Sequence, residues 1–88
     1  MNNLNFGQAI EALKAGKSVS RVGWNGKKMH LYLEDMLSFT IKAGVFKGQR
    51  RQYEPVIVMF TAQETHQPGW LASQADILAE DWGIVVHE

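Results

Sequence analysis

Only one long segment of the chain carries a helical pattern, and this feature constrains the fold most. Between Asn5 and Ala15 the apolar residues recur at intervals of three and four, which places them on one face of a helix: Phe6, Ala9, Ile10 and Leu13. Asn5 is suited to cap the first turn, with Gln8 as its capping-box partner. Gly16 stands where a left-handed residue ends a helix. The sequence therefore predicts an N-terminal helix followed by shorter elements.

Short apolar runs separated by turn residues predict a sheet in the rest of the chain. Strands are expected at Ser18–Val22, Lys28–Glu34, Val56–Phe60 and Trp82–Val86. The β-branched composition of the third run is typical of a central strand. The first two strands surround the sequence GWNG and could form a hairpin, although its Asn25-Gly26 pair is also typical of any tight turn.

Two segments carry weaker patterns. We interpret Asp35 to Glu54 as one or two strands with a polar, mobile loop from Gly44 to Gln52. Thr61 to Gly69 is expected to be a loop because polar residues, Pro and Gly dominate it.

A second, short helix is predicted from Ser73 to Ala79, just before the last strand. Ser73 is its expected N-cap, Asp76 completes the capping box, and Ile77 and Leu78 are expected to supply its apolar contacts. The order of elements predicts a single α+β domain spanning residues 1–88, with an antiparallel sheet.

Composition excludes several classes of function. Nine basic and nine acidic residues leave no net charge, so a bulk nucleic-acid-binding surface is not expected. The absence of cysteine excludes disulfides, thiolate catalysis and cysteine-ligated zinc. The N-terminus lacks a signal-peptide pattern and no segment is long and apolar enough to span a bilayer, so we expect a soluble, cytoplasmic protein without membrane contact. Because 88 residues bury only about two-thirds of their unfolded surface, we also expect self-association.

The three tryptophans are the first candidates for a binding site. Trp82 alternates with Ile84 and Val86, which favours a role in the core. Trp24 lies in a turn and Trp70 follows a Pro-Gly loop. Each of these two either closes one end of the core or presents an indole face on which a nucleobase can stack.

Polar candidates lie beside both tryptophans. Arg21, Lys27 and Lys28 flank the Trp24 turn and would suit a phosphate-bearing ligand, although solvated cations are common on hairpins. Ser73, Gln74 and Asp76 surround the start of the second helix, which is either an ordinary capping box or an anion site.

The sequence gives little support for a catalytic function. No nucleophile elbow, P-loop or dinucleotide-binding glycine motif is present. His30, His66 and His87 are scattered, and Glu80-Asp81 is interpreted as a solvated turn. We therefore expect no enzymatic activity, no catalytic residues, no metal site and no cofactor.

Three segments together resemble a known phage and prophage family. They are NFGQAIEALKAGKSVSRVGWNGKKMHLYL, YEPVIVMFTA and GWLASQADILAEDWGIV. They are similar to the small family, long catalogued as a domain of unknown function, that includes the second-described type of Thoeris anti-defence protein. The resemblance covers most of the chain apart from the interval between Asp35 and Gln52.

The resemblance implies a function that agrees with these residues. Thoeris defence produces a cyclic ADP-ribose isomer as an alarm signal, and such proteins bind that signal without degrading it. The family implies a homotetramer that holds glycocyclic ADP-ribose between subunits, with cyclic oligonucleotides bound elsewhere by some members. On this basis the binding residues would be Trp24 and Trp70 for stacking, Asn25, Ser73, Gln74 and Asp76 for polar contacts, and Arg21 and Lys28 for the diphosphate.

Two other hypotheses remain open at the level of sequence. One is a protein-interaction or inhibitor module that binds a host protein through its aromatic residues. The other is a hydrolase for the same signal, which the missing catalytic motifs disfavour.

Overall fold

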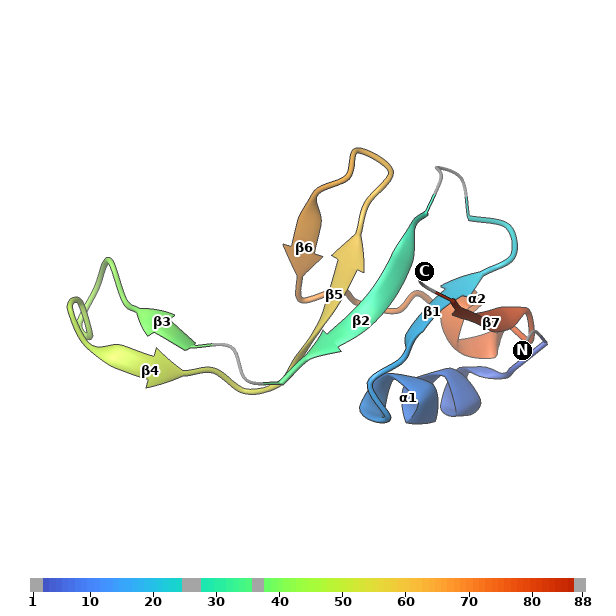
Figure 1. Cartoon of the computed structure of the whole chain (residues 1–88), viewed down its shortest axis with the longest axis horizontal. Helices are drawn as coiled ribbons and strands as arrows, with labels where there is room; N and C mark the ends of the chain where they lie inside the picture. The colour runs from blue at the N-terminus through green and yellow to red at the C-terminus, as the bar shows by residue number, and fades with distance from the viewer. Residues whose placement is uncertain (1–2, 25–27, 36–37, 87–88) are drawn as a thin grey trace.

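A computed structural model describes residues 3–24, 28–35 and 38–86 of the chain. It contains a five-stranded antiparallel sheet, a helix on one face of that sheet and a short second helix before the last strand (Figure 1). A separate two-stranded hairpin projects from this body. The predicted α+β architecture is confirmed.

Helix α1 spans Phe6–Lys14 and has both predicted caps. The Asn5 side chain accepts a hydrogen bond from the backbone N–H of Gln8 (2.8 Å), and the Gln8 side chain accepts one from the N–H of Asn5 (2.9 Å). At the other end Gly16 adopts a left-handed conformation with φ of +87°. The N–H groups of Gly16 and Lys17 donate to carbonyls of the last turn, which is the Schellman arrangement.

The main sheet has the strand order β6-β5-β2-β1-β7, and every pairing in it is antiparallel. The strands are β1 (Ser18–Arg21), β2 (His30–Glu34), β5 (Val56–Phe60), β6 (His66–Pro68) and β7 (Trp82–Val85). As expected, β5 is flanked on both sides, although β2 takes the middle position. The predicted hairpin of β1 and β2 is confirmed by the pairing of Val19 with Leu31.

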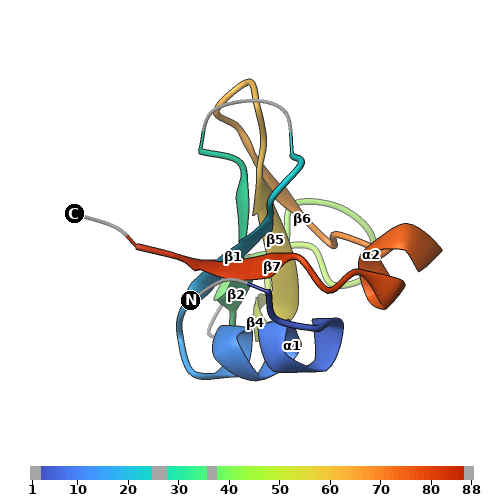
Figure 2. The same cartoon turned by 90° about the vertical axis from the view of Figure 1, so that its right-hand side faces the viewer.

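The core lies between α1 and one face of the sheet (Figure 2). Alternate residues of β1 and β2 point toward the helix, and the fully buried side chains include Val19, Leu31 and Trp82. The helix contributes Ala9, Ala12 and Leu13, which is the face that its periodicity predicted. No described helix is long and apolar enough to cross a membrane.

Two predicted loops contain strands. His66–Pro68 forms the edge strand β6, joined to β5 by a turn in which the Thr61 and Thr65 hydroxyls are 2.7 Å apart. Arg50–Gln52 forms β4, within the segment interpreted as a polar loop. Both strands are fully exposed and polar, so their sequences lack the apolar alternation on which strand prediction depends.

Strand ends differ slightly from the predictions. β2 begins at His30 rather than at Lys28, because Lys28 has a φ of +69°, which is incompatible with a strand. β1 ends at Arg21 and β7 at Val85. The Asn25-Gly26 pair of the expected hairpin turn lies outside the described residues.

The second sheet is a protruding arm, which we define as residues 38–53. Strands β3 (Ser38–Thr40) and β4 pair antiparallel over three residues each. The aromatic rings of Phe39 and Tyr53 meet edge to face at 4.7 Å. Figure 1 shows the arm extending from the far ends of β2 and β5, away from α1.

Helix α2 spans Gln74–Leu78 with Ser73 as its N-cap, as predicted. The prediction that apolar contacts hold this helix is wrong. None of its residues, all of which are described, is buried, and Ile77 and Leu78 are both exposed. The helix is held by its cap and by polar contacts with the neighbouring strands.

Candidate functional site

A turn at the end of β1 returns the Trp24 side chain to the core. The N–H of Trp24 donates to the carbonyl of Arg21 at 3.3 Å, which closes the turn. The Trp24 indole meets the ring of Trp82 edge to face, with centroids 5.4 Å apart. Trp24 is therefore half-buried, with one part packed on the core and the other open to solvent.

Trp70 reaches the same place from the connection between β6 and α2. The N–H groups of Gly69 and Trp70 both donate to the carbonyl of Ile57 at 3.0 Å. Gly69 has a φ of +82°, a conformation that residues with a side chain rarely adopt. The half-buried Trp70 ring lies 6.2 Å from Trp82 and 6.3 Å from Trp24. Trp24, Trp70 and Trp82 form one group in mutual contact, which we call the tryptophan cluster.

Trp82 is the buried centre of the tryptophan cluster. It is 0% exposed, which confirms its predicted core position. Its Nε1–H donates to the carbonyl of Asp76 at 3.0 Å and so fastens β7 to α2. Because this polar atom is satisfied, the large side chain is buried without an unpaired donor.

The two half-buried indoles do not form parallel walls. Their planes are inclined by 63° and their edges meet. A base sandwiched between two rings would need both rings parallel to it. In this structure Trp24 and Trp70 instead meet edge to face, and both pack against the core that contains Trp82.

Arg21 is held by two carboxylates. Its Nη1 donates to Asp76 and its Nε donates to Asp81, each at 3.0 Å. These hydrogen bonds, Asp81 first and Asp76 second, raise the pKa of Arg21 above its ordinary value. Sequence reasoning missed Asp81, interpreting it as part of a solvated turn. The signal that could have revealed it is the register of β1 with β7, which pairs Arg21 with Trp82, the residue after Asp81.

Most of the polar groups predicted to bind a ligand at the start of α2 are engaged in the cap of that helix. The Asp76 carboxylate accepts from the N–H and the hydroxyl of Ser73, and from Arg21. Burial opposes ionisation of Asp76, but these hydrogen bonds and the nearby guanidinium outweigh it, so the pKa lies below its ordinary value. Asp76 therefore points inward to its partners, whereas Gln74 is exposed.

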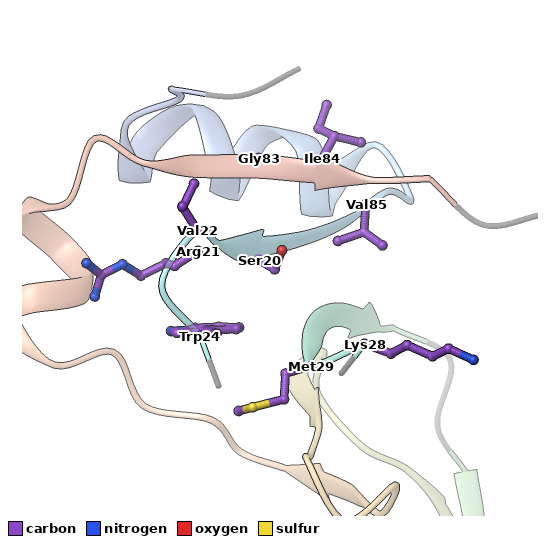
Figure 3. Close-up of a pocket in the computed structure, with 9 residues that line it drawn as sticks. All are labelled: Ser20, Arg21, Val22, Trp24, Lys28, Met29, Gly83, Ile84 and Val85. Carbon is purple, nitrogen blue, oxygen red and sulfur yellow. The ribbon is translucent and has the colours of Figure 1, made fainter. Parts of the chain in front are cut away.

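A cavity of about 330 Å³ opens beside Trp24 (Figure 3). Its walls come from β1, β7 and the start of β2: Ser20, Arg21, Val22, Trp24, Lys28, Met29, Gly83, Ile84 and Val85. Figure 3 shows Arg21 running toward α2, while Lys28 extends in the opposite direction. Trp24 and Lys28 therefore line one cavity. The side chains of the two cations, Arg21 and Lys28, do not point toward a common position.

The other candidates lie apart from this cavity or outside the described residues. Trp70 lines a second cavity of about 320 Å³ with Met59 and the residues 66–69. Asn25 and Lys27 fall in a part of the chain that the structure does not describe. Across the described ranges, no group of three His, Cys, Asp or Glu side chains is arranged to hold a metal ion.

Comparison with known proteins identifies the family. The model of the Tad2-like family, described as the Thoeris anti-defense 2-like domain, matches residues 4–85. The chain belongs to this family. It is also 40% identical over 85 residues to "Thoeris anti-defense 2" of Bacillus phage SP01, covering 93% of this chain and 94% of that protein. The resemblance found in the sequence is thereby confirmed.

The family match includes every element of the structure. Residues 4–85 run from the residues before α1 to the end of β7 and contain the arm, the cavities lined by Trp24 and Trp70, and the whole tryptophan cluster. All helices and strands of the described structure therefore belong to the Tad2-like domain.

Proposed function

We propose that this protein is a phage anti-defence sponge that binds a cyclic ADP-ribose isomer, glycocyclic ADP-ribose, and withholds it from Thoeris immunity. It acts in the host cytoplasm by sequestration and does not transform its ligand. The observation that carries this proposal is the half-buried indole of Trp24 at a cavity of about 330 Å³, in a chain of the Tad2-like family.

The chemistry of the ligand matches the residues around that cavity. The adenine stacks on the open side of Trp24, while Trp70 supports that indole by an edge-to-face contact. Lys28 lines the same cavity, and we propose that it contacts the diphosphate. We propose that Asn25 and the exposed Gln74 supply the remaining polar contacts with the ribose and base. The Asp76 carboxylate bonds to Arg21 and Ser73, so these three side chains hold the start of α2 in place rather than face the cavity.

The size of the cavity supports a site completed by a second subunit. Pockets for small ligands span about 300–1,000 Å³ and enclose most of the ligand surface. The cavity beside Trp24 lies at the lower end of that range and is open. We propose that the protein is a homo-oligomer, a tetramer, in which neighbouring chains close the site.

Calorimetric titration with glycocyclic ADP-ribose tests this function. The wild-type protein should bind tightly, and heating the complex should release the ligand intact. Trp24→Ala should weaken binding by about 5- to 150-fold, the range for one lost base-stacking contact of roughly 1–3 kcal/mol. Trp24→Phe, which keeps an aromatic face, should retain most of the affinity.

The two rival functions give different results in the same experiment. Recovery of an altered ligand would establish a hydrolase. No binding of glycocyclic ADP-ribose or of cyclic dinucleotides by a folded protein would contradict the sponge and favour a protein-interaction module.

A further inference from the structure

The turn that presents Trp24 has few packing contacts of its own. Val22 is 72% exposed, and a Cβ added at Gly23 would meet no atom within 4 Å beyond its chain neighbours. The backbone hydrogen bond from Trp24 to the Arg21 carbonyl is long, at 3.3 Å. The bond from the N–H of Val22 to the Asp81 carbonyl has the same length. These contacts alone therefore hold the turn only weakly.

The Arg21 side chain ties the start of this turn to two other elements. Its guanidinium donates to the carboxylate of Asp81, just before β7, and to that of Asp76, in α2, each at 3.0 Å. We call Arg21, Asp76 and Asp81 the arginine clamp. Hydrogen bonds between charged groups are shorter and stronger than those between neutral groups. The Arg21 and Asp76 side chains are only 23% and 14% exposed, so water screens their contact incompletely. The arginine clamp is therefore a stronger link between the turn and the fold than the long backbone hydrogen bonds.

The arginine clamp is directly connected to the tryptophan cluster. Asp81 precedes Trp82 in the chain, and the register of β1 with β7 pairs Arg21 with Trp82. The carbonyl of Asp76 accepts the indole N–H of Trp82 at 3.0 Å. Trp24 meets Trp82 edge to face, with ring centroids 5.4 Å apart. A displaced Arg21 would therefore move the Trp24 turn relative to the ring on which the Trp24 indole packs.

The arginine clamp also leaves Arg21 poorly suited to bind an anion. One guanidinium faces two carboxylates, so the ionised group carries a net negative charge. Figure 3 shows the Arg21 side chain running toward α2, whereas Lys28 extends in the opposite direction. A diphosphate that approached Arg21 would also be repelled by both carboxylates.

We infer that Asp81 and Arg21 are positioning residues of the proposed ligand site, which hold the Trp24 indole where a base can stack on it. Arg21 acts through the turn and does not contact the diphosphate, in contrast to the role that the family resemblance implies for it. The inference rests on the proposed function for its ligand. The arrangement of the arginine clamp around the tryptophan cluster does not depend on that ligand.

The direction of the effect of Asp81→Asn distinguishes positioning from a direct effect of charge. Removing a carboxylate near an anionic ligand should by itself strengthen binding, and it would free Arg21 for the diphosphate. Loss of positioning should weaken binding instead. In calorimetric titration with glycocyclic ADP-ribose, we expect the affinity of Asp81→Asn to fall at least about 5-fold, the lower end of the range for one lost base-stacking contact. Glu80→Gln neutralises the exposed neighbouring residue and is the matched control, which should bind as the wild type does.

A double-mutant cycle shows whether Asp81 acts through Trp24. Trp24→Ala removes the ring that the arginine clamp positions, so adding Asp81→Asn to it should change the affinity less than about 2-fold. Independent contributions would multiply instead. Arg21→Lys is a second variant, which keeps the charge but cannot span both carboxylates as the guanidinium fork does. It should weaken binding as Asp81→Asn does.

Circular dichroism separates a displaced ring from an unfolded chain. The far-UV spectra of Asp81→Asn and Glu80→Gln should match that of the wild type. The near-UV signal of aromatic side chains depends on fixed tertiary packing. It should therefore decrease in Asp81→Asn, whose Trp24 is less firmly held, and stay unchanged in Glu80→Gln.

Several outcomes would overturn the inference. They are unchanged or tighter ligand binding by Asp81→Asn, a loss that multiplies with that of Trp24→Ala, or a near-UV spectrum of Asp81→Asn identical to that of the wild type. A folded wild type that ignores glycocyclic ADP-ribose would contradict the proposed function, and the near-UV spectra would then still decide whether the arginine clamp positions Trp24.

Discussion

At the scale of single residues, the three tryptophans divide between stability and binding although their rings touch. Trp82 is fully buried and hydrogen-bonded, whereas Trp24 is half-buried at the edge of a cavity. We therefore predict that Trp82→Ala lowers the free energy of unfolding by about 3–5 kcal/mol. Trp24→Ala should lower it by less than half as much, because fewer of its contacts are buried. Urea unfolding followed by circular dichroism measures both. Equal losses would show that Trp24 is also principally a core residue.

Asp76 should give the fold an acid-sensitive contact. Its pKa is lowered from 3.8 in the folded chain, so its contribution is present above that value and is lost as the pH falls through the folded pKa. Asp76→Asn should cost about 1.5–3 kcal/mol at neutral pH, the range for hydrogen bonds to a charged group. Below pH 3.8 the variant should lose stability less steeply than the wild type.

Thermal unfolding from pH 7 downward measures the effect of Asp76. Glu11→Gln serves as the control, because Glu11 makes only an exposed pair with Lys14 at 3.7 Å. Parallel melting curves for the wild type and Asp76→Asn across the acid range would contradict the assigned role.

At the scale of elements, structure that is encoded by neighbouring residues was predicted well. Structure that depends on pairing with a distant segment of the chain was not. The capping boxes of Asn5 and Ser73 are encoded within four residues, and both were predicted correctly. The strands β4 and β6 are polar and exposed, so only their pairing partners define them. The same limit applies to Asp81, since its contact with Arg21 joins residues 60 positions apart. Ile77 and Leu78 were expected to supply apolar contacts but are exposed, because no local pattern tells whether an apolar side chain on a short helix is covered by the rest of the chain.

The end of α1 offers a prediction at this scale. Gly16 has a φ of +87°, and a Cβ added there would meet no atom within 4 Å beyond its chain neighbours, so a substitution tests backbone conformation alone. Gly16→Ala should cost about 1–2 kcal/mol, the usual penalty for a left-handed residue with a side chain. Gly7→Ala, within the helix, should be neutral or stabilise by up to about 1 kcal/mol. Chemical denaturation of the pair checks this, and a neutral Gly16→Ala would show that the helix ends differently in solution.

At the scale of the whole molecule, charge is divided unequally between the arm and the rest of the chain. The arm carries Lys42, Lys47, Arg50 and Arg51 and no acidic residue. A chain without net charge has no long-range self-repulsion, and in the proposed oligomer the arm of one copy can attract acidic residues of another. Attraction of this kind is stronger at low ionic strength, whereas burial of apolar side chains such as Val45 and Leu78 is not weakened by salt. The response to salt therefore distinguishes the contributions of the two kinds of contact.

We predict that salt weakens the proposed oligomer without dissolving it completely. The Debye length falls from about 30 Å at 0.01 M ionic strength to about 3 Å at 1 M, so charge attraction between the arm and other copies is largely screened at the higher value. The dissociation constant measured by sedimentation should rise with sodium chloride concentration. In the variant with Lys42→Glu and Lys47→Glu the slope should be shallower or reversed, because the attractive charges of the arm are removed. Val86→Glu should keep the wild-type slope, since this exposed residue lies outside the arm. A wild-type dissociation constant that stays constant or falls across this range would mean that apolar contacts alone join the copies, and that the charge on the arm serves another purpose.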